Sequence, residues 1–289
     1  MRIYAYSKAL YSTWMYVEPL RLLLDAGEGL NTFLEGRLLA FRDLLVSHAH
    51  TDHFTGIQNI LITRLREMEV TKTDLPIMTI TYPGDSPTLQ RYFEYLQDVV
   101  DRFDDLAELR PVKPGDTLPL YGARGLHVTA LKANHHVHGQ TALAYRVEQE
   151  RWTLKPEMEG IPQKEINKRI ALEGREAVTT KVFKPVLYYS GDGRVSMKHH
   201  DENIPLMLHE CTFIEPNRKV THASLPDIIQ LFRKAKPEQL LLFHLSTRYE
   251  FKEFLRTLDR MVPNPEERAK IFAVRPGSFF SRDIPVPGF

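Results

Sequence analysis

Residues 47–53, which read Ser47-His48-Ala49-His50-Thr51-Asp52-His53, decide how the rest of this sequence is interpreted. Three imidazoles and one carboxylate stand within six consecutive positions. The preceding Leu44-Leu45-Val46 predicts a short buried strand, and apolar residues at helical spacing predict a helix over 57–68. The cluster therefore lies on a tight loop between a strand and a helix, where side chains can converge on one point. Imidazole and carboxylate bind zinc and similar divalent ions, so the stretch predicts a metal site rather than a solvated polar loop.

The spacing inside the cluster suggests two sets of ligands. His48 and His50 are two residues apart, so both imidazoles point to the same side of an extended segment. Asp52 and His53 continue around the turn and can face a second ion.

Composition describes an ordinary globular chain. It has 289 residues, of which 43% are hydrophobic and 26% are charged, enough for one large α/β domain. The formal net charge of +1 gives no global basic field, so any nucleic-acid site must be a local patch. The single cysteine, Cys211, excludes an intrachain disulfide and indicates a reducing compartment. No apolar run approaches the ~18 residues that span a bilayer, and Met1–Ser7 has no signal-peptide core, so we expect a cytoplasmic protein that binds no membrane.

The His-x-His-x-Asp-His string resembles the signature of the metallo-β-lactamase fold, and the chain is most similar to its ribonuclease Z (tRNA 3′-processing endonuclease) group. The other similar segments are Asp25-Ala26-Gly27-Glu28-Gly29, His209-Glu210-Cys211-Thr212-Phe213, Thr221-His222-Ala223-Ser224 and His244-Leu245-Ser246-Thr247-Arg248-Tyr249. Two departures are Ser7-Lys8-Ala9-Leu10, where the group often has a Gly-rich loop, and Ala223. The resemblance implies an α/β protein with a four-layer αββα sandwich. We expect a single domain over 1–289, with a short arm at 149–184.

The resemblance also implies two zinc ions per chain, with Mn²⁺ or Fe²⁺ as alternatives. The first ion would be bound by His48, His50, His135 and Asp192, and the second by Asp52, His53, Asp192 and His244. Asp192 stands between two glycines and can approach both ions closely, although a plain Asp-Gly turn is the alternative. Asp25 would accept a hydrogen bond from a ligand histidine or a loop amide, or else belong to an ordinary turn.

The third histidine of the first ion is not settled by the sequence. His135 with Val137 fits the family pattern, with a two-residue insertion before Tyr145-Arg146. Counting back from Tyr145 without a gap selects His138 instead. We favour His135.

The resemblance assigns catalytic roles to three residues. Asp52 would orient the attacking hydroxide, and His222 would protonate the leaving oxygen while Glu210 holds it. The alternative for His222 is a histidine that caps a helix. Cys211 is interpreted as a small buried residue, and His199 and His200 as surface residues.

Residues 149–184 form the least regular part of the sequence. They hold eight basic and six acidic residues, a balance of 8 − 6 = +2. In ribonuclease Z an arm that binds tRNA lies between the same two metal motifs, but the Gly-Pro of its tip is missing here. A solvated charged hairpin is the alternative. Similarity to the group also implies a homodimer.

The predicted function is that of a dinuclear zinc phosphodiesterase and endoribonuclease. It would cut the 3′ trailer from precursor tRNA with a metal-bridging hydroxide. The alternative substrate is a small phosphodiester or a cyclic nucleotide, which the near-neutral charge and the missing Gly-Pro favour. A metal-binding scaffold without catalysis is a third hypothesis, from another class. The sequence predicts no particular substrate-binding residues.

Overall fold

The computed structural model describes residues 1–196, 203–216 and 221–287. His199 and His200 lie outside these ranges. Over the described residues the strands are β1 Arg2–Lys8, β2 Ser12–Val17, β3 Leu22–Leu24, β4 Asp43–Leu45, β5 Met78–Pro83, β6 Ala107–Val112, β7 Thr117–Pro119, β8 Leu126–Lys132, β9 Leu143–Leu154, β10 Thr179–Tyr189, β11 Leu206–Glu210, β12 Gln239–Phe243, β13 Ile271–Ala273 and β14 Phe280–Asp283. The α-helices are α1 Leu30–Leu34, α2 Ile57–Thr71, α3 Pro87–Val99, α4 Phe103–Leu106, α5 Gln163–Glu173, α6 Leu225–Ala235, α7 Phe251–Met261 and α8 Pro265–Ala269.

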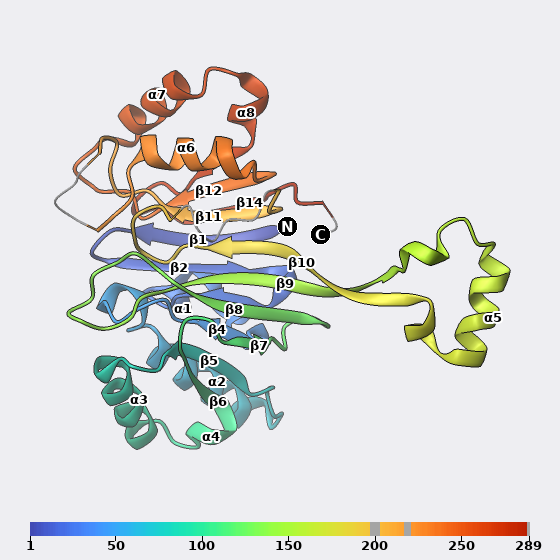
Figure 1. Ribbon diagram of the computed structural model, residues 1–289. Helices are drawn as coiled ribbons and strands as arrows, with labels where there is room; N and C mark the ends of the chain where they lie inside the picture. The colour runs from blue at the N-terminus through green and yellow to red at the C-terminus, as the bar shows by residue number, and fades with distance from the viewer. Residues whose placement is uncertain (197–202, 217–220, 288–289) are drawn as a thin grey trace.

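The strands form two mixed sheets that lie face to face. One sheet has the order β14-β1-β2-β3-β4-β5-β6, and the other β13-β12-β11-β10-β9-β8-β7. Helices α1 to α4 cover the outer face of the first sheet, and α6 and α7 that of the second (Figure 1). This is the α/β four-layer αββα sandwich that the sequence predicted.

The core between the sheets follows from alternation along the strands. Ile3 and Ala5 of β1 face inward and belong to one buried cluster with residues of the other sheet such as Leu187 and Leu241. The opposite faces of the same strands carry the larger cluster under the helices. Because both faces are apolar, most central strands are fully buried, and the polar residues are left to the loops at the strand ends.

The metal loop follows the carboxyl end of β4. Strands β3, β4 and β5 run parallel, so the loops after β3 and β4 emerge at the same edge of the sheet. Gly27 and Gly56 let these segments touch: a Cβ on Gly27 would overlap the main-chain oxygen of Asp52, and one on Gly56 that of Gly27. The sequence therefore holds the loop against the turn that carries Asp25.

The segment 149–184 is more regular than the sequence suggested. Strands β9 and β10 pair antiparallel as far as Leu154 and Thr179, well beyond the rest of the sheet. Between them lies α5, flanked by short 3₁₀ turns, and Met158, Ile166 and Val178 form a small core of their own. Figure 1 shows this arm projecting away from the sandwich.

Among the described residues, none of the helices combines the length and the apolar character that crossing a membrane requires.

Candidate metal centre

The structure brings the predicted metal residues together into two groups. In the first group, one atom from each of His48, His50, His135 and Asp192 lies within 4.8 Å of the others. The same limit holds for the second group, Asp52, His53 and His244. These side chains come from the loops after β4, β8, β10 and β12, at one edge of the sandwich.

Asp192 joins the two groups. Its Oδ2 lies 3.9 Å from Nε2 of His48 in the first group. The same oxygen lies 3.5 Å from Nε2 of His53 and 3.2 Å from Nε2 of His244 in the second. Gly191, with a φ of 56°, has its Cα against Ser47 and the main-chain oxygen of Leu143, where a Cβ would clash. Glycine therefore allows the close approach that places Asp192 between the groups.

The first group contains His135 and not His138. Nδ1 of His50 lies 3.0 Å from Nε2 of His48 and 3.3 Å from Nε2 of His135. His138 is exposed and has a φ of 45°, on the turn that leads into β9. Burial, and the neighbouring imidazole of His135, lower the pKa of His50 to about 4, and burial also lowers the pKa values of His48 and His135. The three imidazoles of the first group are therefore neutral at pH 7, and a neutral imidazole has a lone pair to offer a cation.

Four histidines direct Nε2 into the centre, and in each of them Nδ1 forms a hydrogen bond to a neighbouring residue. The partners of Nδ1 are the Ser47 hydroxyl for His48 (2.8 Å), Asp25 for His53 (2.6 Å), the Thr221 carbonyl for His135 (3.2 Å) and the Thr212 hydroxyl for His244 (3.0 Å). Such contacts fix the tautomer and direct the other nitrogen at a metal.

Asp25 braces the site in both of the ways expected. Its Oδ1 accepts the Ser47 amide at 2.6 Å, and its Oδ2 accepts Nδ1 of His53. The Ser47 and Tyr189 hydroxyls also donate to Oδ2, at 2.7 and 2.5 Å. A fully buried carboxylate with these donors is fixed in orientation, so it in turn fixes His53.

Among the described residues, several buried ligand atoms of the two groups lack a hydrogen-bond partner, which is expected of atoms that bind a metal ion. Nε2 of His53, Nε2 of His244 and Oδ1 of Asp192 are buried, and within the described parts of the chain they have no hydrogen-bond partner. Leaving buried polar atoms without a partner is costly. The two nitrogens lie 3.5 and 3.2 Å from the other carboxylate oxygen, Oδ2 of Asp192. Imidazole nitrogen and carboxylate oxygen are ligands that zinc accepts.

His222 and Glu210 lie beside the metal groups. Nδ1 of His222 donates to Oε1 of Glu210 at 2.9 Å. Burial lowers the pKa of His222, but the hydrogen bond and the charge of Glu210 outweigh it and raise the pKa to about 9. Helix α6 begins at Leu225 with Ser224 as its N-cap, so His222 does not cap the helix. One ligand atom of His222 also lies within 4.8 Å of ligand atoms of Asp192 and His244. Whether His222 binds a metal ion is therefore tested in the Discussion's first prediction.

Sequence reasoning missed several residues that shape the site. Thr212, Thr221 and Tyr189 each contact a predicted site residue or its brace. Thr212 belongs to the His-Glu-Cys-Thr segment and Thr221 directly precedes His222. Their place in these motifs could have indicated that they lie at the site. Cys211 is fully buried, as expected.

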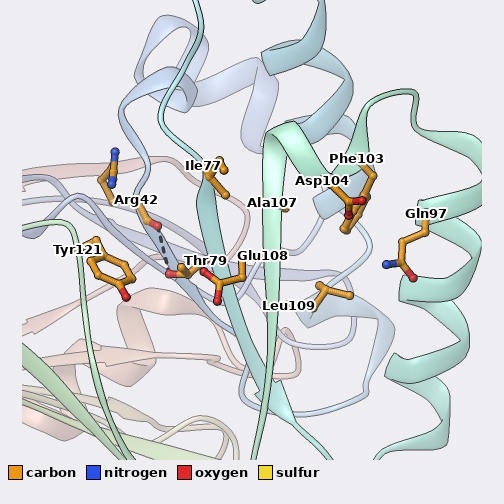
Figure 2. Close-up of a pocket in the computed structure, with 10 residues that line it drawn as sticks. All are labelled: Arg42, Ile77, Thr79, Gln97, Phe103, Asp104, Ala107, Glu108, Leu109 and Tyr121. Atoms are coloured by element: carbon orange, nitrogen blue, oxygen red, sulfur yellow. Dashed lines mark hydrogen bonds between the residues drawn. The ribbon is translucent and has the colours of Figure 1, made fainter.

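A separate pocket of about 490 Å³ lies at the other end of the strands of the first sheet, away from the metal loop. It opens beside the amino ends of β5 and β6, next to α3 (Figure 2). Figure 2 shows Thr79 in its wall, with its hydroxyl oxygen 3.3 Å from the main-chain oxygen of Arg42. Because the metal loop follows the carboxyl end of β4, this pocket is not part of the metal centre.

Comparisons with known proteins agree with this geometry. A family model described as anti-Pycsar protein Apyc1 matches residues 4–260. The chain belongs to this family. It is similar to tRNase Z TRZ1 of Arabidopsis thaliana, with 26% identity over 281 residues, 92% of each chain. It is also 26% identical over 258 residues to ribonuclease Z of Sulfolobus acidocaldarius, covering 82% of both.

Solved structures show the same fold. The metallo-β-lactamase fold protein YhfI from Bacillus subtilis superposes with a TM-score of 0.63 at 15% identity, over 98% of this chain and 100% of that one. The short form of human tRNase Z gives 0.60 at 14% identity, over 99% and 100%. The relatives confirm the prediction of a metal-dependent hydrolase similar to ribonuclease Z, and the solved structures confirm the fold.

Proposed function

We propose that this chain is a dinuclear zinc phosphodiesterase. The position of Asp192 carries the proposal, because its Oδ2 lies within 4 Å of Nε2 of both His48 and His244. A carboxylate placed between two sets of nitrogens is suited to bridge two ions. The first ion would be held by His48, His50, His135 and Asp192, and the second by Asp52, His53, Asp192 and His244.

When bound, the two ions would supply an activated water as nucleophile and would neutralise charge that develops at phosphorus. The chain's own residues complete the reaction. Asp52 is the most exposed carboxylate of the centre, at 11% of its side chain, and would orient the attacking water. His222 would donate a proton to the leaving oxygen, since Glu210 keeps its imidazole charged at neutral pH.

Precursor tRNA is the first candidate substrate. The relatives named ribonuclease Z and tRNase Z match the chain across most of its length, which supports removal of the 3′ trailer with a 3′-hydroxyl left on the tRNA. In this proposal the arm would contact RNA. The protein would act in the cytoplasm as a homodimer, with one subunit's arm holding the tRNA cut by the other.

A small phosphodiester, such as a cyclic nucleotide, is the second candidate. The arm's charge balance favours it: residues 149–184 carry eight basic and six acidic residues, so 8 − 6 = +2. Two of the cations are paired within the arm, Lys181 with Glu150 and Arg169 with Glu165. The net charge of the arm stays at 6 − 4 = +2 without these pairs, which is little positive charge to neutralise an RNA backbone. The matched family is also named for an anti-Pycsar protein and not for tRNA processing.

One experiment separates the two candidates. Leu154 and Thr179 face each other in the β9–β10 register, so residues 155–178 can be replaced by an Asn-Gly turn that closes the hairpin. The zinc-loaded full chain and this shortened chain are both given labelled precursor tRNA, a panel of cyclic nucleotides and bis-p-nitrophenyl phosphate. The shortened chain's zinc content and its rate on the nitrophenyl ester serve as controls for folding.

For a tRNA enzyme, the full chain cuts the trailer, and the shortened chain loses at least about tenfold on tRNA while keeping its rate on the small ester. For a cyclic-nucleotide enzyme, the full chain cuts one of those nucleotides and leaves precursor tRNA intact. A full chain that binds two zinc ions and cuts no phosphodiester would refute the proposed function. Sedimentation of the full chain at micromolar concentration tests the homodimer.

A further inference from the structure

The hydroxyl of Thr212 lies between the metal centre and the Glu210–His222 pair. Thr212 follows β11 and is nearly buried, with 7% of its surface exposed. Its Oγ1 lies 3.0 Å from Nδ1 of His244 and 2.9 Å from Oε2 of Glu210. One hydroxyl therefore contacts both a proposed ligand of the second ion and the carboxylate that holds the proposed acid.

The directions of these two hydrogen bonds follow from the groups involved. An ionised carboxylate only accepts, and the pKa of Glu210 is lowered because the hydrogen bond from His222 and its charge outweigh burial. Thr212 has a single hydroxyl proton, which it must donate to Glu210. Its oxygen is then left to accept from Nδ1–H of His244.

This contact decides which nitrogen of His244 faces the second group. With the proton on Nδ1, Nε2 carries the lone pair. That Nε2 lies 3.2 Å from Oδ2 of Asp192 and 3.7 Å from Oδ2 of Asp52. The hydroxyl thus directs an electron pair at the place where the second ion would bind.

Glu210 does not depend on this hydroxyl for its own position. Its Oε1 accepts the amides of Gly193 and Ala223, each at 3.0 Å, as well as His222. Its Oε2 also accepts the amide of Thr212 at 2.9 Å. Four other donors would therefore hold the carboxylate if the hydroxyl were removed. For Nδ1 of His244, by contrast, the Thr212 hydroxyl is the hydrogen-bond partner found among the described residues.

The backbone of His244 is held separately. Its amide donates to Oγ of Ser7 at 2.8 Å, and its φ of 58° places it in the left-handed region. The ring also stacks on His222, with centroids 5.3 Å apart and planes 10° apart. Backbone and stacking restrict where the ring lies, but only a partner at Nδ1 fixes the tautomer.

We propose that Thr212 is a positioning residue for the second metal ion, whose hydroxyl fixes the tautomer and the rotation of His244. The inference rests on the proposed function in assigning His244 to a metal. Loss of such an outer partner typically weakens metal binding about 10- to 100-fold.

The test compares Thr212→Val, which keeps the side chain's shape without its hydroxyl, with Thr212→Ser, which keeps the hydroxyl. Zinc is added to the metal-free proteins in competition with a chromophoric chelator, and the affinities of the two sites are fitted separately. Thr212→Val should bind one ion about 10- to 100-fold more weakly and the other normally. Thr212→Ser should bind both within about threefold of the unchanged protein.

Thr79→Val is the matched control. Thr79 is also buried, at 3% exposed, and donates to Asp43 at 2.6 Å, but it lies at the opposite edge of the sheet. It should lose stability and keep both zinc affinities. If Thr212→Val does not fold, Thr212→Ala takes its place, because it removes the hydroxyl without an added methyl group.

Normal affinity for both ions in the valine or alanine variant would overturn the inference. So would equal weakening of both ions that serine does not restore, because that pattern reflects a general loss of structure. A chain that shows the predicted single-site defect but cuts no phosphodiester would refute the proposed function and leave the role of Thr212 intact.

Discussion

Nδ1 of His222 lies 2.9 Å from Oε1 of Glu210, on a segment that belongs to neither of the two metal groups. The carboxylate keeps this imidazole charged at neutral pH, as an acid that protonates a leaving group must be. Nδ1 of His222 also lies 3.9 Å from Oδ2 of Asp192. At that distance His222 could instead be a metal ligand, so experiments must distinguish a proton donor from a ligand. Four predictions separate these roles and test the assignments around them.

The first prediction concerns proton donation. His222→Ala should keep both ions and lose about 10²- to 10⁴-fold in kcat/KM on an ester with a poor leaving group, because a general acid contributes about that much. The loss should be much smaller with a nitrophenolate leaving group, which departs without protonation. The measurement is kcat/KM on both kinds of ester, with zinc quantified in the same samples.

Glu210→Gln is the companion variant for this prediction. It should show a smaller loss with the same dependence on the leaving group, since Glu210 orients His222 and does not reach the substrate. Equal losses of His222→Ala on both esters, or loss of an ion, would identify His222 as a ligand or a structural residue.

The second prediction concerns the bridge. Asp192→Ala should lose both ions and all measurable activity, because Oδ2 of Asp192 faces histidines of both groups. Metal content is measured by elemental analysis after gel filtration. Asp116→Ala, at a turn on the surface, is the control and should bind both ions. Two ions per chain in Asp192→Ala would exclude the bridging role.

The third prediction distinguishes two neighbouring histidines. His135→Ala should bind one ion about 10-fold or more weakly, because Nε2 of His135 faces His50 at 3.3 Å. His138→Ala is a matched control, since its exposed side chain lies outside both groups. Both variants are titrated with zinc against a chelator. A defect in His138→Ala alone would reverse the assignment.

The fourth prediction concerns stability of the metal-free protein. The pKa of His222 is raised from 6.5 to about 9 in the folded state. The resulting stabilisation is fully present below pH 6.5 and is lost as pH rises through about 9, because only the folded state still holds the proton in between. A shift of this size corresponds to about 3 kcal/mol.

Urea unfolding in the presence of a chelator tests it at pH 6 and at pH 9.5. The unfolding free energy of the unchanged protein should fall more steeply between these pH values than that of His222→Gln, which has no proton to lose. Parallel pH dependences in the two proteins would show that the Glu210–His222 contact does not stabilise the fold.

Some errors of the sequence interpretation have local causes. Pro156, Gly160, Pro162 and Gly174 made 149–184 look irregular, although β9 and β10 pair at its two ends and α5 lies between them. Alternation of side chains is masked there because both faces of a projecting hairpin are exposed. Strand β14 was not predicted, since its four residues carry no clear pattern and pair with β1 at the other end of the chain.

The sequence by itself determined the fold class and most of the proposed metal ligands. His48, His50, Asp52 and His53 fall within six positions between a strand and a helix, where side chains can converge on one point, and the family resemblance assigned them to two ions. Asp192 and His244 each follow an apolar run, at 185–189 and 239–243, that predicts a buried strand, so both were expected at a strand end.

Only the tertiary structure decided what lies behind those residues. It placed His135, and not His138, against His50, and it set Thr212 against His244 and Tyr189 against Asp25, pairs that are 32 and 164 residues apart. These contacts depend on how two sheets close over a shared core. The spacing of residues along the chain does not predict these contacts. A hydrogen bond between distant segments forms only when the packing of the elements between them brings the two groups together.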